Sequence, residues 1–404
     1  MPETADLKPP PELAAQLAEV AVFASEQLER YVGAWPSDRA APVHTVDGKW
    51  YRPAELWTDW TPGFFAGQLW ILSRLAKCDA SIDAEKWRRR AEEYTERLKH
   101  RRHDRDVHDL GFVFLSSYGR WIDALEADDP RRQELEDVVV TAATVQSFRY
   151  NSIGEDEFIY SFNGPQSLFI DIMMNVRLLF WASTRGAEPE VLRRALAHCH
   201  TSARYLVRRD GPSLGAEDGS VAHEAIFNTD PGRGEFRCLS TQQGYSPFSC
   251  WARGLAWALY GFAEAYRYVQ EPEFLEAAER CAKYYLKHTP ENGVPPWDYG
   301  APGLPEEPDD SSAAAIAGCG FHILAQQVSD GSVEGEARAE KYREACHRIA
   351  GTLSGPDYLA KFSPAQEGIL LHGVYHRPNN WGVDASVPWG EYFFLELVER
   401  LLLS

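Results

Sequence analysis

Apolar residues recur at helical spacing along almost the whole of this 404-residue chain, whereas convincing strand patterns are scarce. We predict about twelve helices from this spacing and from helix start signals. Their approximate ranges are 12–34, 62–77, 84–101, 111–126, 130–148, 167–184, 188–208, 247–269, 272–288, 310–328, 335–353 and 388–402. Short extended pieces are expected near 44–51 and 212–240, where Gly, Pro and Asp cluster.

The predicted helices are similar in length and recur roughly every 30–35 residues, a period found in helical-hairpin architectures. Because no sequence self-similarity accompanies the period, a closed ring is favoured over an open solenoid. We therefore predict an all-α fold, an α/α barrel or toroid, whose loops surround a central cavity at one end. No linker separates two distinct halves, so residues 1–404 are predicted to form a single domain, with residues 1–10 as a flexible tail.

Three helix starts carry recognisable capping signals. Ser246 followed by Pro247 offers an N-cap and then a proline in the first turn of the helix predicted from residue 247. Asp309 or Asp310 can cap the run SSAAAIAGCG, and Asp83 can cap the helix that contains AEKWRRRAEEYTERL.

Composition excludes several classes of partner. A net charge of -19 argues against nucleic acid and anionic membranes, although a small anionic substrate remains possible where a site carries local cations. No apolar run is long enough to span a bilayer, and the N-terminal stretch lacks the pattern of a secretory signal. The seven cysteines show no CxxC or zinc-site spacing, which predicts reduced, mostly buried thiols in a cytoplasmic protein without a metal site. Oligomeric state is not readable.

An aspartate inside an apolar stretch is the first candidate for chemistry. FIDIMMNVRLLFWAS, residues 169–183, reads as a helix that is apolar on almost every face, with Asp171 within it. Burial would raise the pKa of this carboxyl, which suits a general acid near neutral pH. The alternative is a structural aspartate bonded to a neighbouring amide, such as Asn175, or to loop backbone; spacing alone favours this commoner case.

A second carboxylate stands before another apolar helix. VHDLGFVFLSSYG places His108 and Asp109 ahead of a glycine and a hydrophobic run. Asp109 can be a helix N-cap, which is the common case. It can also be the second member of a carboxylate pair, an arrangement that recurs in glycoside cleavage.

Three further stretches combine polar and aromatic residues. In TQQGYSPFSCWARGLAWALYGFA, Arg253 and Trp257 share a helix face and Gln243 lies in the preceding loop. An Arg fork matches a carboxylate and a Trp face can stack on a sugar, but a solvating Arg and a core Trp are equally expected. LWTDWTPGFFAGQLW carries Trp60 before an inner helix, and LLHGVYHRPNNWGVDASVPWGEYFF resembles a site loop. There is no GxGxxG, P-loop or GxSxG motif.

Together these stretches resemble the unsaturated glucuronyl hydrolases, glycoside hydrolase family 88. The motifs that carry the resemblance are HDLGF, IDIMMN with LLFWAS, QQGYSPFSCWARGLAW, VPPWDYGAP with DDSSAAAIA, and LLHGVYHRPNNWGVDASVPWGEYFF. The resemblance implies an α/α barrel of six hairpins and removal of an unsaturated uronic acid from the non-reducing end of lyase products. It implies Asp171 as general acid and base and Asp109 as the second carboxylate. It places substrate contacts on Trp60, His108, Gln243, Arg253 and Trp257, with no metal or other cofactor.

The chain departs from the family pattern in one loop. Where the family reads roughly RPDGSxxH, this chain has RRDGPSLG, so Gly215 stands where a substrate-contacting histidine is expected. His223 or His200 could substitute. This departure leaves the partner sugar, the linkage and the sulfation preference open. It also keeps three alternatives in view: an unsaturated rhamnogalacturonyl hydrolase, a sugar epimerase or isomerase on the same barrel, and an inactive sugar-binding protein.

Overall fold

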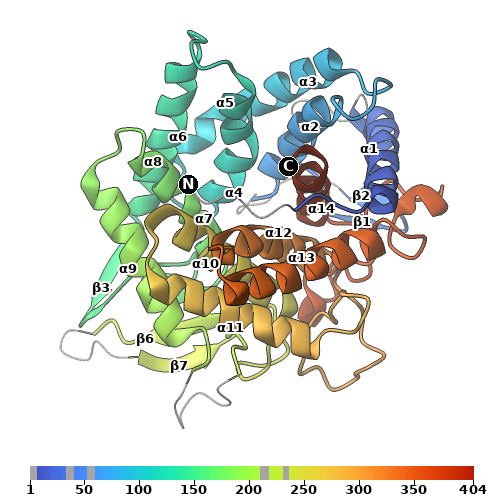
Figure 1. Cartoon of the computed structure of the whole chain (residues 1–404). Helices are drawn as coiled ribbons and strands as arrows, with labels where there is room; N and C mark the ends of the chain where they lie inside the picture. Colours follow the sequence, from blue (N-terminus) through green and yellow to red (C-terminus); the bar gives the residue numbers. More distant parts are fainter. Residues whose placement is uncertain (1–6, 33–40, 52–59, 210–217, 231–235) are drawn as a thin grey trace.

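The structure, a computed structural model, describes residues 7–32, 41–51, 60–209, 218–230 and 236–404, and helices dominate it (Figure 1). The longer helices are α1 (Pro11–Val32), α2 (Pro62–Leu75), α3 (Ala84–Glu96), α6 (Arg132–Ser147), α9 (Pro189–Tyr205), α10 (Ala252–Val269), α11 (Pro272–His288), α12 (Ser311–Val328), α13 (Val333–Leu353) and α14 (Pro388–Leu403). The shorter ones are α4 (Leu110–Phe114), α5 (Arg120–Ala124), α7 (Ile172–Asn175), α8 (Arg177–Ser183), the π-helical segment η2 (Leu115–Gly119), and the 3₁₀ segments η1 (Lys99–His103), η3 (Ala360–Phe362) and η4 (Arg377–Asn379).

The helices form two concentric layers (Figure 1). The inner layer is a closed ring in which each helix packs on the next. Helix α2 packs on α4 and η2, α4 packs on α7 and α8, and both α7 and α8 pack on α10. Helix α10 then packs on α12, α12 packs on α14, and α14 packs on α2, which closes the ring. Helices α1, α3, α6, α9, α11 and α13 pack outside this ring. Each outer helix alternates along the chain with an inner one, so the architecture is a closed α/α barrel of six hairpins. The fold predicted from the sequence is confirmed.

Small residues let the inner helices approach closely. Helix α12 begins with the run SSAAAIAGCG and is buried over almost its whole length. A Cβ on Gly320 would lie 3.2 Å from the Cα of Tyr260 on α10, so only glycine fits this crossing without a shift. Asp310 caps α12 as predicted, since its side chain accepts from the backbone N–H groups of Ser312 and Ala313. Asp83 likewise accepts from Lys86 N at the start of α3.

The stretch 167–184 is the main error in the helix predictions. Its first residues form strand β5 (Ser167–Phe169), followed by the short helices α7 and α8. The strand pairs with β6 (Glu224–Phe227), which pairs with β7 (Phe236–Ser240). Short apolar runs satisfy both helical and strand patterns, and the pairing partner lies far along the chain. Asp171 therefore sits at a strand-to-helix junction rather than inside a helix.

Other predicted boundaries also differ. Ser246 and Pro247 lie in a loop, and α10 begins only at Ala252, whose N–H donates to Trp297 O at 3.0 Å. The predicted helix 111–126 is divided into α4, η2 and α5. The remaining strands are β1 (His44–Val46), β2 (Lys49–Tyr51), β3 (Tyr150–Ile153) and β4 (Asp156–Ile159), of which β3 and β4 were not predicted.

The chain start and the cysteines complete the fold. Leu7 is buried, and its carbonyl oxygen lies 3.1 Å from His347 Nε2. The flexible tail predicted for residues 1–10 thus excludes Leu7, while residues 1–6 lie outside the described residues. All seven cysteines are free thiols and five of them are buried, as predicted. Among the helices described, none is long and apolar enough to cross a bilayer.

Candidate active site

A cavity of about 230 Å³ lies where the loops lead into the inner helices. Its lining comprises Trp60, His108, Asp109, Phe112, Phe162, Phe169, Asp171, Gln242, Gln243, Arg253, Tyr375, His376 and Trp381. Most of these residues precede or open α2, α4, α7, α10 or α14, so the N-terminal ends of the inner helices face the cavity. The partial positive charge at the starts of α2 and α10 favours an anionic ligand there.

Gly111 brings the two candidate carboxylates to the same cavity. A Cβ on Gly111 would lie 2.5 Å from the Cα of Asn175, so the glycine permits α4 and α7 to touch. Asn175 fixes the contact, because its Oδ1 accepts from Phe112 N at 2.9 Å and its Nδ2 donates to the backbone oxygen of Asp171 at 3.2 Å. Asn175 therefore holds the backbone of Asp171 and leaves its carboxylate to the cavity.

Asp109 is buried against a neutral histidine. It occupies the N-cap position of α4, but its side chain makes no capping hydrogen bond. His108 Nδ1 accepts from Phe162 N at 3.1 Å, which leaves the ring N–H at Nε2, 3.4 Å from Asp109 Oδ1. Burial lowers the pKa of His108 to about 3. Burial, together with the nearby charge of Asp171, raises the pKa of Asp109 to about 8.

Asp171 has a similar histidine partner but the opposite pKa shift. His223 Nδ1 accepts from Gln242 N at 3.0 Å and from Gln243 N at 3.3 Å, so its Nε2 carries the N–H that lies 3.4 Å from Asp171 Oδ2. Burial favours the neutral carboxyl, but His223, His108 and Arg253 outweigh it and lower the pKa of Asp171. The raised pKa predicted for Asp171 is therefore wrong; Asp109 has the raised pKa instead.

The two histidines suggested for the altered loop lie in different places. Gly215 lies outside the described residues, but His223 projects from the turn before β6 onto Asp171. His200 does not reach the cavity: it lies on α9 and pairs with Glu271 and Glu273. Of the two histidines suggested from the sequence, only His223 takes part in the site.

Arg253 lines the cavity, but its two terminal nitrogens already donate hydrogen bonds to other groups of the protein. Its Nη2 donates to Gln243 Oε1 at 2.5 Å and to Tyr375 O at 2.8 Å. Its Nη1 donates to Val374 O and lies 3.4 Å from Asp310 Oδ2. The expected bidentate grip on a substrate carboxylate is therefore not preformed. Arg253 instead orients Gln243 and adds positive charge beneath the site.

The tryptophans divide between the cavity and the core. Trp60 lines the cavity and stacks on Trp389 with a centroid distance of 4.7 Å. Trp257 is only 1% exposed, does not line the cavity and packs on Phe112, so the predicted direct contact with substrate is not seen. Trp381 belongs to the C-terminal stretch noted in the sequence and is 54% exposed at the cavity.

Three lining residues had no individual signal in the sequence. Phe162 follows β4 in a segment without any recognised motif, and it stacks on His108 with a centroid distance of 5.2 Å. His376 and Tyr375 lie within the C-terminal stretch, but nothing distinguished them from their neighbours. Within the described ranges, no three His, Cys, Asp or Glu side chains form a group that could hold a metal ion.

Comparisons with known proteins identify relatives of this chain. No family model matches the chain. A curated unsaturated glucuronyl hydrolase of Formosa agariphila is 31% identical over 363 residues, covering 89% of this chain and 81% of that protein. One of Bacillus sp. (strain GL1) is 33% identical over 356 residues, covering 85% and 86%. An unsaturated chondroitin disaccharide hydrolase of Streptococcus pyogenes serotype M1 is 32% identical over 348 residues, covering 85% and 81%.

Solved structures show the same likeness. An unsaturated glucuronyl hydrolase specific for heparin superimposes with a TM-score of 0.82 at 28% identity, covering 96% of this chain and 97% of that one. An unsaturated glucuronyl hydrolase from Streptococcus agalactiae superimposes with a TM-score of 0.82 at 27% identity, covering 96% and 92%.

Proposed function

Because the chain belongs to the unsaturated glucuronyl hydrolase family, we propose that it removes the 4,5-unsaturated uronic acid from the non-reducing end of oligosaccharides that polysaccharide lyases release. The observation that carries the proposal is the carboxylate pair. Asp109 and Asp171 line one cavity, each faces a histidine N–H, and their pKa values are shifted in opposite directions. Two carboxyl groups whose pKa values differ in this way can supply an acid and a base in one site.

The substrate is an enol ether with its double bond between C4 and C5 of the uronic acid. Addition of a proton to C4 leaves an oxocarbenium-like cation at C5 and the ring oxygen. Water then adds to C5 and loses a proton, which gives a hemiketal. The hemiketal opens and releases the partner sugar, so the overall reaction consumes one water. Only a proton donor, a proton acceptor and water take part, and no cofactor enters the proposal.

The carboxylate pair would hold the proton that this reaction needs. Before substrate binds, Asp109 would hold this proton, because its pKa is raised and two like charges in one buried cavity cannot both form easily. When the anionic uronic acid enters, it displaces water and brings a negative charge toward Asp171. Both changes raise the pKa of Asp171 and draw the shared proton onto it. We assign Asp171 as the acid toward C4 and then the base toward water, with Asp109 stabilising the developing positive charge.

The surrounding side chains would place the sugar ring. Trp60 offers an aromatic face at one wall, and Gln243 presents an amide whose oxygen is held by Arg253. His108 and His223 keep their Nε2 N–H groups on the two carboxylates because backbone N–H groups occupy both Nδ1 atoms. Trp257 supports the cavity from below. The seven free thiols support a cytoplasmic location for this activity.

The test is a panel of unsaturated disaccharides from chondroitin, hyaluronan, heparin, ulvan and pectin lyases. Hydration removes the conjugated double bond, so turnover appears as loss of ultraviolet absorbance. We expect at least one substrate to be consumed, with products whose summed mass exceeds that of the substrate by one water. A product of unchanged mass would instead indicate an isomerase or epimerase. Consumption of the pectin product alone would indicate a rhamnogalacturonyl activity, and binding without turnover an inactive sugar-binding protein.

A further inference from the structure

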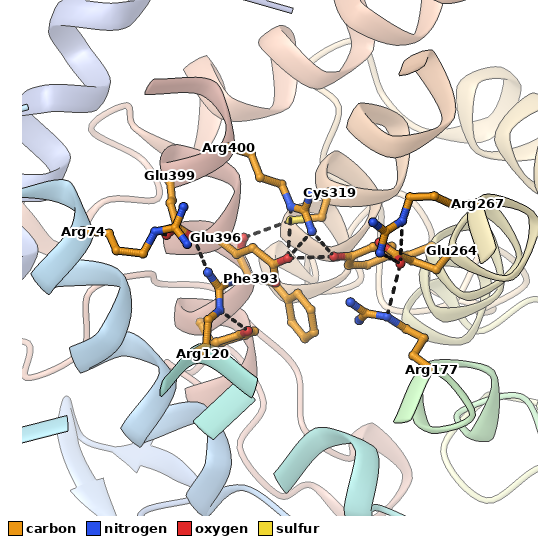
Figure 2. Close-up of polar contacts among 12 residues, drawn as sticks. Arg74, Arg120, Arg177, Glu264, Arg267, Cys319, Phe393, Glu396, Glu399 and Arg400 are labelled. Atoms are coloured by element: carbon orange, nitrogen blue, oxygen red, sulfur yellow. Dashed lines mark hydrogen bonds and ion pairs between the residues drawn. The ribbon is translucent and has the colours of Figure 1, made fainter. Parts of the chain in front are cut away.

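A second cavity, of about 380 Å³, opens at the opposite end of the barrel. Residues near the C-terminal ends of α2, α10, α12 and α14 line it, together with residues of η2, α5 and α8. Phe112 contributes to both cavities, so the two lie on opposite sides of the same aromatic layer. The second cavity is dominated by arginine and glutamate side chains, which Figure 2 shows converging from several helices.

Most of these arginines have an evident structural role. Arg74, Arg267 and Arg400 occupy the last turns of α2, α10 and α14, where a cation offsets the partial negative charge of a helix end. Each of them, and Arg120, also has a glutamate partner. The ion pairs are Arg74–Glu399 at 2.7 Å, Arg120–Glu399, Arg400–Glu396 at 2.6 Å and Arg267–Glu264 at 2.6 Å.

Arg177 is different. It opens α8 rather than ending a helix, so no helix terminus accounts for it. Its nearest carboxylate is Glu264, whose Oε2 lies 3.9 Å from Arg177 Nε and already accepts two hydrogen bonds from Arg267. Within the described residues, Arg177 Nε is buried and donates no hydrogen bond. Figure 2 shows this guanidinium with a single dashed contact, to Glu264, whereas Arg267 has several.

His322 on α12 is a second unsatisfied donor at the same cavity. It is 3% exposed, and neither ring nitrogen has a hydrogen-bond partner in the described part of the chain. Gln326, one turn further along α12, lines the cavity as well. A buried ring N–H without an acceptor is unfavourable, so an acceptor in the cavity would be stabilising.

We propose that this second cavity binds a small oxyanion of the phosphate or sulfate class, free or as an ester, through the Arg177 guanidinium and the N–H of His322. The other arginines at this cavity pair with Glu264, Glu396 and Glu399, whereas Arg177 Nε and both ring nitrogens of His322 have no hydrogen-bond partner within the described ranges. A guanidinium offers donors only and cannot ligate a metal ion. An anion that accepts several hydrogen bonds satisfies these donors. The volume exceeds that of one phosphate, which leaves room for an ester's organic part.

The experiment is calorimetric titration of the whole chain with inorganic phosphate, inorganic sulfate, glucose 6-phosphate and glucosamine 6-sulfate at millimolar concentration. We expect one site, with binding weakened roughly tenfold or more in Arg177→Gln because charge-assisted hydrogen bonds are lost. His322→Phe replaces the imidazole with a ring of similar size that has no N–H, and it should weaken the same binding. This second variant tests the proposal even if Arg177→Gln does not fold. Tighter binding of either ester than of the inorganic ions would identify an esterified ligand.

Two controls separate this site from other surfaces. Arg193→Gln removes an exposed arginine that pairs with Glu190 and should leave the affinity unchanged. Asp171→Asn alters the catalytic cavity only, and phosphate should bind this variant as it binds the wild type. Absence of binding by all four probes, or binding that survives both Arg177→Gln and His322→Phe, would overturn the proposal and identify the cavity as a water-filled space. Hydrolase activity is not the readout, so the result is independent of the proposed function.

Discussion

The two ends of the barrel treat buried carboxylates in opposite ways. At the catalytic end, Asp109 faces a neutral imidazole and the charge of Asp171, and its pKa rises to about 8. At the far end, burial also disfavours the charge of Glu396, yet Arg400, Arg120 and Arg177 lower its pKa to about 2. Burial is common to both groups. The neighbouring cations decide whether a carboxyl keeps its proton at neutral pH.

The difference follows from how each end is built. The loops that lead into the inner helices contribute His108 and His223, whose Nδ1 atoms accept from backbone N–H groups, and burial lowers the pKa of His108 to about 3, so that this ring stays neutral. The last turns of α2, α10 and α14 contain arginines, which remain charged under all ordinary conditions. One end therefore retains an exchangeable proton, and the other end fixes its charges in place.

The largest expected effect is on chemistry at the catalytic end. Asp171→Asn removes the proposed acid and base while keeping the size of the side chain, so kcat should fall by about 10³–10⁴-fold with the fold intact. Absorbance loss under saturating substrate measures this, and circular dichroism checks the fold. Asp123→Asn, at the other cavity, is the matched control and should retain nearly full activity. A variant Asp171→Asn with more than a tenth of wild-type kcat contradicts the assignment.

The next effect is on stability at the far end. Arg400→Met leaves Glu396 buried with fewer cations and should lower the free energy of unfolding by about 3–5 kcal/mol. Urea unfolding measures this change. The exposed pair Arg193–Glu190 provides the control, because Arg193→Met should cost at most about 1 kcal/mol. If kcat per folded molecule changes more than about twofold in Arg400→Met, the two ends are not independent.

The pH dependence of kcat/KM tests the contrast between Asp109 and Glu396. Asp109 keeps its proton below its pKa of about 8 and loses it above, so kcat/KM should fall about tenfold per unit as pH rises beyond 8. The residual activity of Asp109→Asn should lack this decline, since asparagine has no proton to lose in that range. A decline of unchanged position in Asp109→Asn would assign the proton to another group. Glu396, with its pKa of about 2, should contribute nothing to the profile.

The smallest effect concerns the mouth of the catalytic cavity. Trp381 is 54% exposed there, and Trp381→Ala should raise KM by about three- to tenfold through loss of stacking on the sugar, with kcat little changed. Phe148 is 53% exposed and does not line the cavity, so Phe148→Ala is the matched control. Equal KM values in the two variants would remove Trp381 from the substrate contacts.

The fold was largely predictable because helical spacing is a local signal. Asp83 and Asp310 cap the predicted helices through contacts with the next few residues. The failures occur where distant segments decide. Ser167–Phe169 becomes a strand because Glu224–Phe227 pairs with it, and α10 starts late because Ala252 bonds to Trp297. Neither partner is adjacent in sequence, so periodicity contains no information about it.

The candidate site was predictable in its membership but less so in its electrostatics. Asp109, Asp171, His108, Gln243, Arg253 and Trp60 all line one cavity, whereas Trp257 supports it from the core. The direction of the Asp171 pKa shift was wrong, because the sequence showed only the apolar residues around it. His223, more than fifty positions away, reverses that shift together with His108 and Arg253. Local sequence thus identifies a buried carboxyl, and tertiary contacts set its charge.

The ring of Phe112 belongs to the walls of both cavities. Phe112 packs between Trp60 and Trp257, with ring centroids 5.5 Å and 5.0 Å away, so this side chain is part of the partition between the two cavities. A shorter side chain at this position would enlarge both cavities at the same place, and a single substitution would then disturb both ends of the barrel together.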